Sequence, residues 1–248
     1  MNFLDLKNKT ILVTGASSGI GRETAILLND LGAKLILTGR NLKKLEETKS
    51  LLKKAHHTFQ ADLTVEAERV ALIVSLPKLD GVVNAAGIIY PFPLKFITEK
   101  HLDAVFDINF KAQALLNSAL LKQKKVAKSC SFVFISSISS QFPYQGGALY
   151  TSTKAALEAY SRSLALEHSG KEIRSNCISP GLVKTQIFEE TLKASNPEEL
   201  EKYEKHYPLG FGDPIDVANT IAFLLSNRSR WITGQNIVLD GGLTLGSK

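Results

Sequence analysis

The sequence predicts a single α/β domain built on a doubly wound, seven-stranded parallel sheet with helices on both faces. Two observations predict this fold class. Short apolar runs, typical of parallel strands that are buried on both faces, alternate along the chain with segments of helical periodicity. Neither a Pro/Gly/Ser-rich linker nor an internal repeat interrupts the 248 residues, so we expect residues 1–248 to form one domain.

Seven apolar runs have the length of strands, and helical patterns fill the intervals between them. Right-handed crossovers between parallel strands then place helices on both faces of an open sheet. Ligands bind such sheets at the carboxyl ends of the strands, where we therefore expect the functional residues. The expected strands are residues 9–14, 34–38, 57–61, 80–84, 131–136, 173–178 and 236–239.

The first expected strand runs directly into a glycine-rich loop. Residues 14–21 read TGASSGIG and precede a helical pattern. Gly15, Gly19 and Gly21 permit positive φ, close approach of a ligand to the backbone and tight packing of the helix on the strand. The N-terminus of that helix offers unpaired N–H groups to a pyrophosphate. The loop therefore predicts a dinucleotide site, and the alternative is a strand–helix turn that merely needs glycine.

The later strands also end at residues that are able to contact a ligand. Residues scattered along the sequence would in this way converge on one edge of the sheet. In chain order they are Arg40 at the second strand, Asp62 at the third, Asn84 at the fourth, Ser136 and Ser137 at the fifth, and Pro180 and Gly181 at the sixth.

Two helical segments carry the remaining candidates. The first covers about 98–123 and contains Asn109, and the second covers about 150–167. Tyr150 and Lys154 are spaced i, i+4 and so lie on one face of the second helix. An ammonium close to a phenol favours the phenolate and lowers the tyrosine pKa, so the pair predicts proton transfer.

Together these motifs resemble the classical short-chain dehydrogenase/reductases. The resemblance extends from Lys9 to Gly242. One position departs from it, because the family usually has a second asparagine where this chain has Ala85. The motifs are T-G-x-x-x-G-x-G at 14–21, Asn84-Ala-Ala-Gly87, Asn109, Ser137 thirteen residues before Tyr150, Lys154, and Pro180-Gly181 followed by Thr185.

The resemblance implies a Rossmann-type domain that transfers hydride between a nicotinamide cofactor and a carbonyl or alcohol carbon. Tyr150 would donate a proton to the substrate oxygen, or accept one in the reverse direction, and Ser137 would donate a hydrogen bond to the same oxygen. Lys154 would lower the tyrosine pKa and bind the nicotinamide ribose. Asn109, which lies at a helix irregularity in the family, would hold a water in a proton relay to the lysine.

The resemblance also implies the cofactor contacts. Asp62 and Leu63 would contact the adenine edge, and Val183 and Thr185 would hold the nicotinamide carboxamide. No metal is expected. The expected cofactor-binding residues are Gly15, Ser17, Ser18, Gly19, Ile20, Gly21, Arg40, Asp62, Leu63, Asn84, Ala85, Ala86, Gly87, Tyr150, Lys154, Pro180, Gly181, Val183 and Thr185.

The end of the second strand predicts NADP in preference to NAD. NAD enzymes place a carboxylate there, which accepts hydrogen bonds from the ribose 2′-hydroxyl and would repel a 2′-phosphate. Gly39 occupies that position in this chain, and Arg40 offers a planar donor fork to the phosphate. The alternative is that Arg40 is a surface residue in the turn before Asn41, which is suited to cap the next helix.

Composition and charge favour a soluble, cytoplasmic protein. No apolar run approaches the roughly 20 residues of a membrane span, and the first seven residues lack the layout of a signal peptide. The two cysteines form neither a disulfide framework nor a metal cluster. The net charge is +6, but the lysine-rich segments lack interleaved aromatic residues, so we expect no nucleic acid binding. A negatively charged cofactor or an acidic carrier fits the charge.

The substrate is the least determined feature. Residues 186–208 are expected to form a lid over it. The nearest likeness is to the 3-oxoacyl-acyl-carrier-protein reductases, in which residues at the positions of Lys128 and Lys171 dock the acidic carrier. Those enzymes usually have arginine there, so the alternative is two ordinary surface lysines. Sugar, polyol, steroid and quinone substrates stay open.

Two other classes of protein fit these residues less well, and an assembly is expected. A non-catalytic nucleotide sensor would not need Ser137, Tyr150 and Lys154 together. A nucleotide-sugar epimerase or dehydratase usually has a different glycine spacing and a larger C-terminal region. By resemblance, the helical segments 98–123 and 150–167 would pack against partner subunits in a homotetramer or homodimer.

Overall fold

The computed structural model describes residues 4, 6–53, 56–185, 188 and 202–246. Within these residues the chain forms one seven-stranded sheet in the order β3-β2-β1-β4-β5-β6-β7, and all neighbouring strands are parallel. The seven predicted strands are confirmed. They are β1 (Thr10–Thr14), β2 (Lys34–Gly39), β3 (His57–Gln60), β4 (Leu79–Asn84), β5 (Val126–Ile135), β6 (Arg174–Pro180) and β7 (Asn236–Leu239).

β5 begins five residues earlier than the apolar run predicts. Its first residues are exposed or half-buried and include Lys128 and Ser129. Ser129 has a φ of 66°, and the register with β4 shifts between Leu79 and Gly81. The irregular, solvated start of the strand carries no hydrophobic signal, which is why sequence periodicity missed it.

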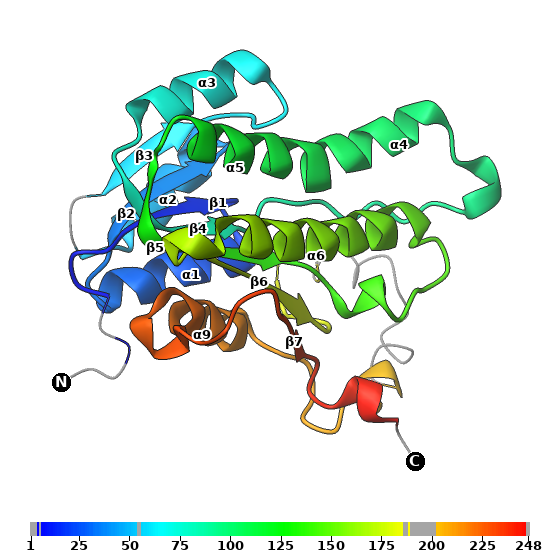
Figure 1. Cartoon of the computed structure of the whole chain (residues 1–248). Helices are drawn as coiled ribbons and strands as arrows, with labels where there is room; N and C mark the ends of the chain where they lie inside the picture. The colour runs from blue at the N-terminus through cyan, green and yellow to red at the C-terminus, as the bar shows by residue number, and fades with distance from the viewer. Residues whose placement is uncertain (1–3, 5, 54–55, 186–187, 189–201, 247–248) are drawn as a thin grey trace.

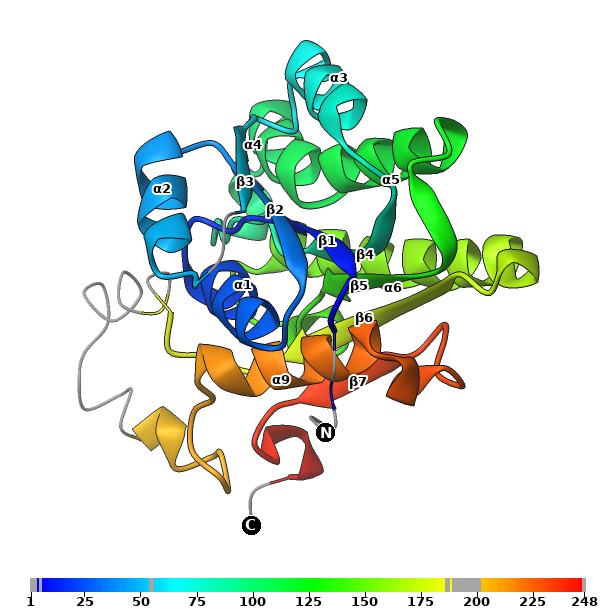
Figure 2. The same ribbon diagram turned by 90° about the vertical axis from the view of Figure 1, so that its left-hand side faces the viewer.

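Helices cover both faces of the sheet, as predicted. Figure 2 shows α1, α2 and α9 on one side and α3, α4, α5 and α6 on the other. The helices are α1 (Gly19–Asp30), α2 (Leu42–Ser50), α3 (Glu66–Ser75), α4 (Glu99–Phe106), α5 (Ala112–Lys122), α6 (Ala148–His168) and α9 (Pro214–Leu225).

The core has two layers because successive strand residues point to opposite faces. Ile11 and Val13 of β1 pack with α1 and α9, whereas Leu12 between them packs with α5 and α6. Both layers are fully buried at β1, which lies between β2 and β4 in the sheet (Figure 1). The continuous apolar run of this strand is the direct consequence.

The long helical stretch predicted at 98–123 is interrupted. α4 and α5 are joined by a π-helical turn at Asp107–Lys111, which contains Asn109. The irregularity that the resemblance implied at Asn109 is therefore present. α4 and α5 remain nearly continuous in Figure 1 and run alongside α6.

The pairing register of β1 with β2 and β4 aligns the carboxyl ends of these three strands. Thr14 pairs with Thr38 on one side and with Asn84 on the other. Because the strand order changes direction at β1, a crevice opens beyond the ends of β1 and β4.

No helix among the described residues combines the length and apolarity needed to cross a bilayer. Of the expected lid at 186–208, residues 186–187 and 189–201 lie outside the described residues.

Candidate active site

A cavity of about 700 Å³ lies at the carboxyl ends of the strands. It is lined by the loops that follow β1, β2, β3, β4, β5 and β6. All the predicted catalytic and cofactor residues line this cavity, with the exceptions of Asn84 and Asn109. Residues that the sequence separates by more than 160 positions, such as Gly15 and Thr185, thus share one wall.

The glycine loop packs closely on neighbouring backbone. Gly15 has a φ of 64°, and a Cβ on it would lie 2.8 Å from the backbone nitrogen of Ala86. A Cβ on Gly21 would lie 2.3 Å from the carbonyl oxygen of Gly15. Among the described residues, the Ser18 side chain makes no capping bond to α1. The first residues of α1, Gly19, Ile20 and Gly21, line the cavity, and the unpaired N–H groups at such a helix N-terminus suit an anionic ligand.

Two residues outside the motif hold this loop in shape. Arg22 donates from Nη2 to the carbonyl oxygen of Ser17 at 2.8 Å, and Thr48 donates from Oγ1 to that of Ala16 at 3.0 Å. Arg22 Nε also donates to Thr48 Oγ1 at 3.1 Å. The sequence did not single these residues out because Thr48 lies on α2 and only the fold brings it to the loop.

The end of β2 contributes Gly39 and Arg40 to the cavity wall. Arg40 is exposed and lines the cavity beside Asp62. Burial opposes ionisation of Asp62, but hydrogen bonds from Thr64 and the charge of Arg40 together lower its pKa. Asn41 caps α2 by accepting a hydrogen bond from Lys44 N at 3.0 Å, as its sequence position suggested.

Asn84 does not lie on the cavity wall, contrary to the expectation. Its side chain is fully buried, and its Oδ1 accepts a hydrogen bond from Asn117 Nδ2 at 3.0 Å. The neighbouring Ala85 and Ala86 do line the cavity, and both of their N–H groups donate to Thr14 Oγ1, at 3.1 and 3.2 Å. Asn84 therefore belongs to the floor beneath the cavity, since its side chain points from β4 towards α5.

Asn109 also lies beneath the wall. Its Oδ1 accepts from Ile88 N at 2.8 Å, and its Nδ2 donates to Ile88 O at 2.9 Å and to Thr153 Oγ1 at 3.3 Å. The carboxamide thus ties the loop after β4 to α6. The carbonyl oxygen of Asn109 accepts a hydrogen bond from Gln113 Nε2 at 2.9 Å. The expected water at this residue stays a prediction.

Tyr150 and Lys154 face the same cavity from the first turns of α6. Lys154 Nζ donates to the carbonyl oxygen of Ile135 at 2.7 Å and lies 5.3 Å from the centre of the Tyr150 ring. Ser137 lines the cavity beside them. Its Oγ accepts hydrogen bonds from Ser139 N at 3.2 Å and from Ser139 Oγ at 2.9 Å. The hydroxyl proton of Ser137 is therefore left to donate towards Tyr150, which is the hydrogen bond that favours the phenolate.

The expected lowering of the tyrosine pKa is not what the folded chain alone produces. Burial raises the pKa of Tyr150 to about 12, with a hydrogen bond from Ser137 opposing the increase. Burial also lowers the pKa of Lys154 to about 8. Sequence spacing places the ammonium near the phenol but says nothing of burial, which here disfavours the charged form of both groups.

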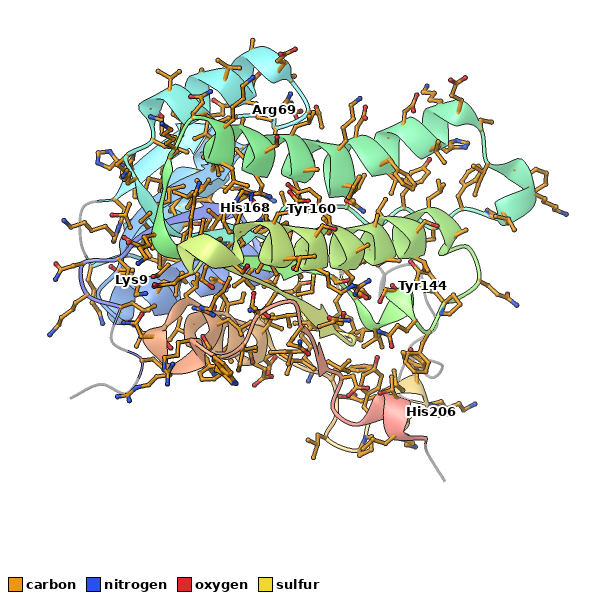
Figure 3. The ribbon with its side chains drawn as sticks, in the orientation of Figure 1. Lys9, Arg69, Tyr144, Tyr160, His168 and His206 are labelled. Atoms are coloured by element: carbon orange, nitrogen blue, oxygen red, sulfur yellow. The ribbon has the colours of Figure 1, made fainter. Side chains whose placement is uncertain are left out.

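The remaining wall is apolar and aromatic. Phe142 and Tyr144 line it between Ser137 and Tyr150, and the ring of Tyr144 packs directly on Gly147, where a Cβ would lie 2.7 Å away. Figure 3 shows Tyr144 at the opposite end of α6 from His168. From the described part of the expected lid, Tyr203 and Tyr207 also reach the cavity, and Tyr207 Oη accepts from Leu182 N at 3.1 Å.

Comparison with known proteins gives consistent likenesses over nearly the whole chain. The sequence profile of a family described as Enoyl-(Acyl carrier protein) reductase matches residues 15–244. A 3-oxoacyl-(acyl-carrier-protein) reductase of Rickettsia felis is 35% identical over 243 residues, which cover 98% of this chain and 99% of the relative. An (S)-acetoin-forming diacetyl reductase of Staphylococcus epidermidis is 32% identical over 260 residues, covering 95% and 98%.

Solved structures agree in fold. A short-chain dehydrogenase/reductase family protein superimposes with a TM-score of 0.87 at 29% identity, covering 97% of this chain and 99% of that one. A structure from Brucella melitensis, described as a short-chain dehydrogenase/reductase and glucose/ribitol dehydrogenase, gives a TM-score of 0.89 at 28% identity over 98% and 99%.

Proposed function

Since the chain belongs to the short-chain dehydrogenase/reductase family, we propose that it is an NADPH-dependent oxidoreductase that reduces a carbonyl to an alcohol, or catalyses the reverse. The observation that carries the proposal is the convergence of Ser137, Tyr150 and Lys154 on the cavity that also holds the glycine loop. A sensor of nucleotides would gain nothing from these three groups.

The chain's own residues fit a nicotinamide dinucleotide. The first residues of α1, Gly19, Ile20 and Gly21, line the cavity, and a pyrophosphate would lie against their unpaired N–H groups. Lys154 would bind the nicotinamide ribose, and Val183 and Thr185 would hold the carboxamide; all three line the cavity, which supports these roles. NADPH supplies the hydride when it is bound.

Three side chains then take part in proton transfer to the substrate oxygen. Tyr150, kept protonated by burial, donates its proton to the oxygen as negative charge develops there. Ser137, whose oxygen is already engaged as an acceptor by Ser139, turns its one hydrogen bond from Tyr150 to the substrate oxygen. Lys154 supports this proton transfer, since its Nζ lies 5.3 Å from the centre of the Tyr150 ring. In alcohol oxidation the direction of each proton is reversed.

Arg40 and Gly39 support NADP as the cofactor. The exposed guanidinium of Arg40 lines the adenine end, and no carboxylate replaces Gly39 at the end of β2. A 2′-phosphate would therefore meet a cation and not an acid. Comparing kcat/KM for NADPH and NADH tests this, and a preference for NADH that is unchanged in Arg40→Ala would overturn it.

The substrate that the cavity fits best is a neutral carbonyl compound with an apolar body. Arg40, Asp62 and Lys154 are the charged side chains among the described lining residues, and none lies with Phe142 and Tyr144 at the aromatic end. A 3-oxoacyl thioester meets this requirement, and the relatives of Rickettsia are named for that substrate on an acyl carrier protein. A small diketone, as the relative of Staphylococcus epidermidis reduces by its name, is the second candidate.

Docking of the acyl carrier stays a prediction. Lys128 forms an ion pair with Glu172 at 2.9 Å and lies, like Lys171, near the amino ends of the strands, away from the cavity.

We propose that the chain assembles into a homotetramer or homodimer through α4–α5 and α6, whose exposed Leu115 and Leu166 would be covered. Light scattering during size exclusion measures the assembly.

One assay tests the reaction class and the substrate. Oxidation of NADPH is followed at 340 nm with acetoacetyl thioesters, diacetyl, sugars and steroid ketones. Crotonyl thioester is included because the matching family profile is named for enoyl reduction. Turnover of a ketone that Tyr150→Phe abolishes supports the proposal. Turnover of the crotonyl compound alone, or of no compound, would refute it, and product formation without net cofactor oxidation would indicate an epimerase.

A further inference from the structure

A buried carboxyl group lies one helical turn beyond Lys154. Glu158 is 7% exposed and is carried by α6, four residues after Lys154 and eight after Tyr150. Burying a carboxylate is costly unless hydrogen bonds replace its lost hydration. The reaction described above gives this group no role.

Three serine hydroxyls from two other segments meet this carboxyl group. Ser136 Oγ donates to Glu158 Oε1 at 2.8 Å and Ser140 Oγ at 2.5 Å. Ser179 Oγ lies 3.2 Å from the same oxygen and 2.8 Å from Asn236 Oδ1, and its single proton serves one of the two. Ser179 lies near the end of β6, whereas Ser136 and Ser140 stand on either side of Ser137. One oxygen atom thus joins the ends of two strands to α6.

The contacts also tie the serine segment to the helix that carries the other reacting groups. Ser136 Oγ lies 3.2 Å from the carbonyl oxygen of Lys154, and Ser140 Oγ lies 2.8 Å from that of Ser137. These contacts form a route by which a displacement of the Glu158 carboxyl group would reach the backbone of Ser137. Small displacements of such groups have large effects on rate.

We propose that Glu158 is a positioning residue, which fixes Ser137 against Tyr150 by holding Ser136 and Ser140. It acts through these serines and does not touch the substrate. The inference rests on the proposed function in one respect, because that function makes the placement of Ser137 matter for turnover. The hydrogen bond from Ser137 also lowers the pKa of Tyr150, so displacement of Ser137 should raise that pKa.

Glu158→Leu and Glu158→Gln test the inference. Leucine fills the space but accepts no hydrogen bond, whereas glutamine keeps an oxygen with the same reach. We expect Glu158→Leu to lower kcat by tenfold or more, with KM for NADPH changed less than about threefold, and Glu158→Gln to restore most of kcat. In Glu158→Leu the pH midpoint of alcohol oxidation should also rise, by about half a unit or more.

Ser179→Ala is the matched control. It removes one hydroxyl contact of Glu158, together with the contact of that hydroxyl to Asn236, but leaves the contacts of Ser136 and Ser140 in place. We expect its kcat within about twofold of the parent and its pH profile unmoved. If Ser179→Ala lowers kcat as strongly as Glu158→Leu, the carboxyl group acts as general support for the fold, and the inference is overturned.

Crystal structures of the parent and of Glu158→Leu separate this inference from the proposed function. The separation of Ser137 Oγ and Tyr150 Oη can be measured whether or not a substrate is known, and we expect it to increase in the variant. An unchanged separation overturns the inference even if the enzyme is a reductase. An increased separation in a protein without reductase turnover supports it while the proposed function fails. If Glu158→Leu does not fold, the double variant Ser136→Ala/Ser140→Ala replaces it in both measurements.

Discussion

Lys154 lies beneath the ring of Tyr150, with its Nζ 5.3 Å from the ring centre and bonded to the carbonyl oxygen of Ile135. Both groups are buried, so the phenol pKa is raised and the ammonium pKa is lowered. The folded chain by itself therefore keeps the proton on the phenol. That is the state which a general acid needs for carbonyl reduction.

Tyr150→Phe should lower kcat by about a thousandfold, because it removes the proton donor and little else. The dissociation constant of NADPH, measured by fluorescence quenching, should change less than about threefold. Tyr160→Phe is the control on the same helix, since Tyr160 Oη bonds the Ala114 carbonyl oxygen away from the cavity. Retained turnover in Tyr150→Phe would remove the tyrosine from the mechanism.

Lys154 should make the stability of the cofactor-free protein depend on pH. Its pKa is about 8 in the folded chain and 10.5 for an unperturbed lysine, so between these values the unfolded chain binds a proton that the folded chain does not. Stability from this residue therefore rises with pH across that window. The free energy of unfolding of the parent, minus that of Lys154→Met, should increase by on the order of 1–2 kcal/mol from pH 8 to pH 10.

Urea unfolding at several pH values measures this difference. The subtraction is needed because burial raises the pKa of Cys130 and of Cys177, and their contribution falls with pH above about 9. That opposing contribution is common to the parent and to Lys154→Met and cancels. A difference that stays flat or falls with pH would contradict the buried placement of Lys154.

Gly39→Asp combined with Arg40→Ala should transfer the preference from NADP to NAD. A Cβ on Gly39 would lie 3.5 Å from Ser17 Oγ and 3.6 Å from Leu45 Cδ2, which are ordinary contacts, so a side chain fits there. The new carboxylate would repel a 2′-phosphate, and kcat/KM for NADPH should fall about a hundredfold. Arg40→Ala alone is the control, which should weaken NADPH without improving NADH. If the ratio of kcat/KM for NADPH to that for NADH is unaltered in the double variant, Gly39 and Arg40 do not select the cofactor.

Gly21→Ala should weaken both folding and cofactor binding. Its Cβ would come within 2.3 Å of the Gly15 carbonyl oxygen, so the loop or the helix must move. We expect a loss of about 1–3 kcal/mol in the free energy of unfolding and at least tenfold weaker binding of NADPH. Gly170→Ala is the matched control, because among the described residues, its two chain neighbours aside, no heavy atom lies within 4 Å of a Cβ there. Equal effects of the two substitutions would show that contact with Gly15 is irrelevant.

Local patterns predicted the elements of the fold but not their irregular parts. The apolar run at 131–136 located β5, whereas the solvated start of this strand, with its register shift against β4, left no periodic signal. Asn84 was placed correctly at the end of β4, yet its side chain turns to Asn117 and not to the cavity. A strand position fixes where a residue lies, whereas the neighbour it bonds depends on which helix packs over it.

The sequence by itself determined the seven strands, the glycine loop and the common helix face of Tyr150 and Lys154, because each of these follows from spacing along a few neighbouring residues. Only the tertiary structure decided the burial of that pair, and with it the direction of both pKa changes. It alone also brought Glu158 to serines from β6 and from both sides of Ser137. Burial and such contacts depend on segments far apart in the chain, so no local spacing can encode them.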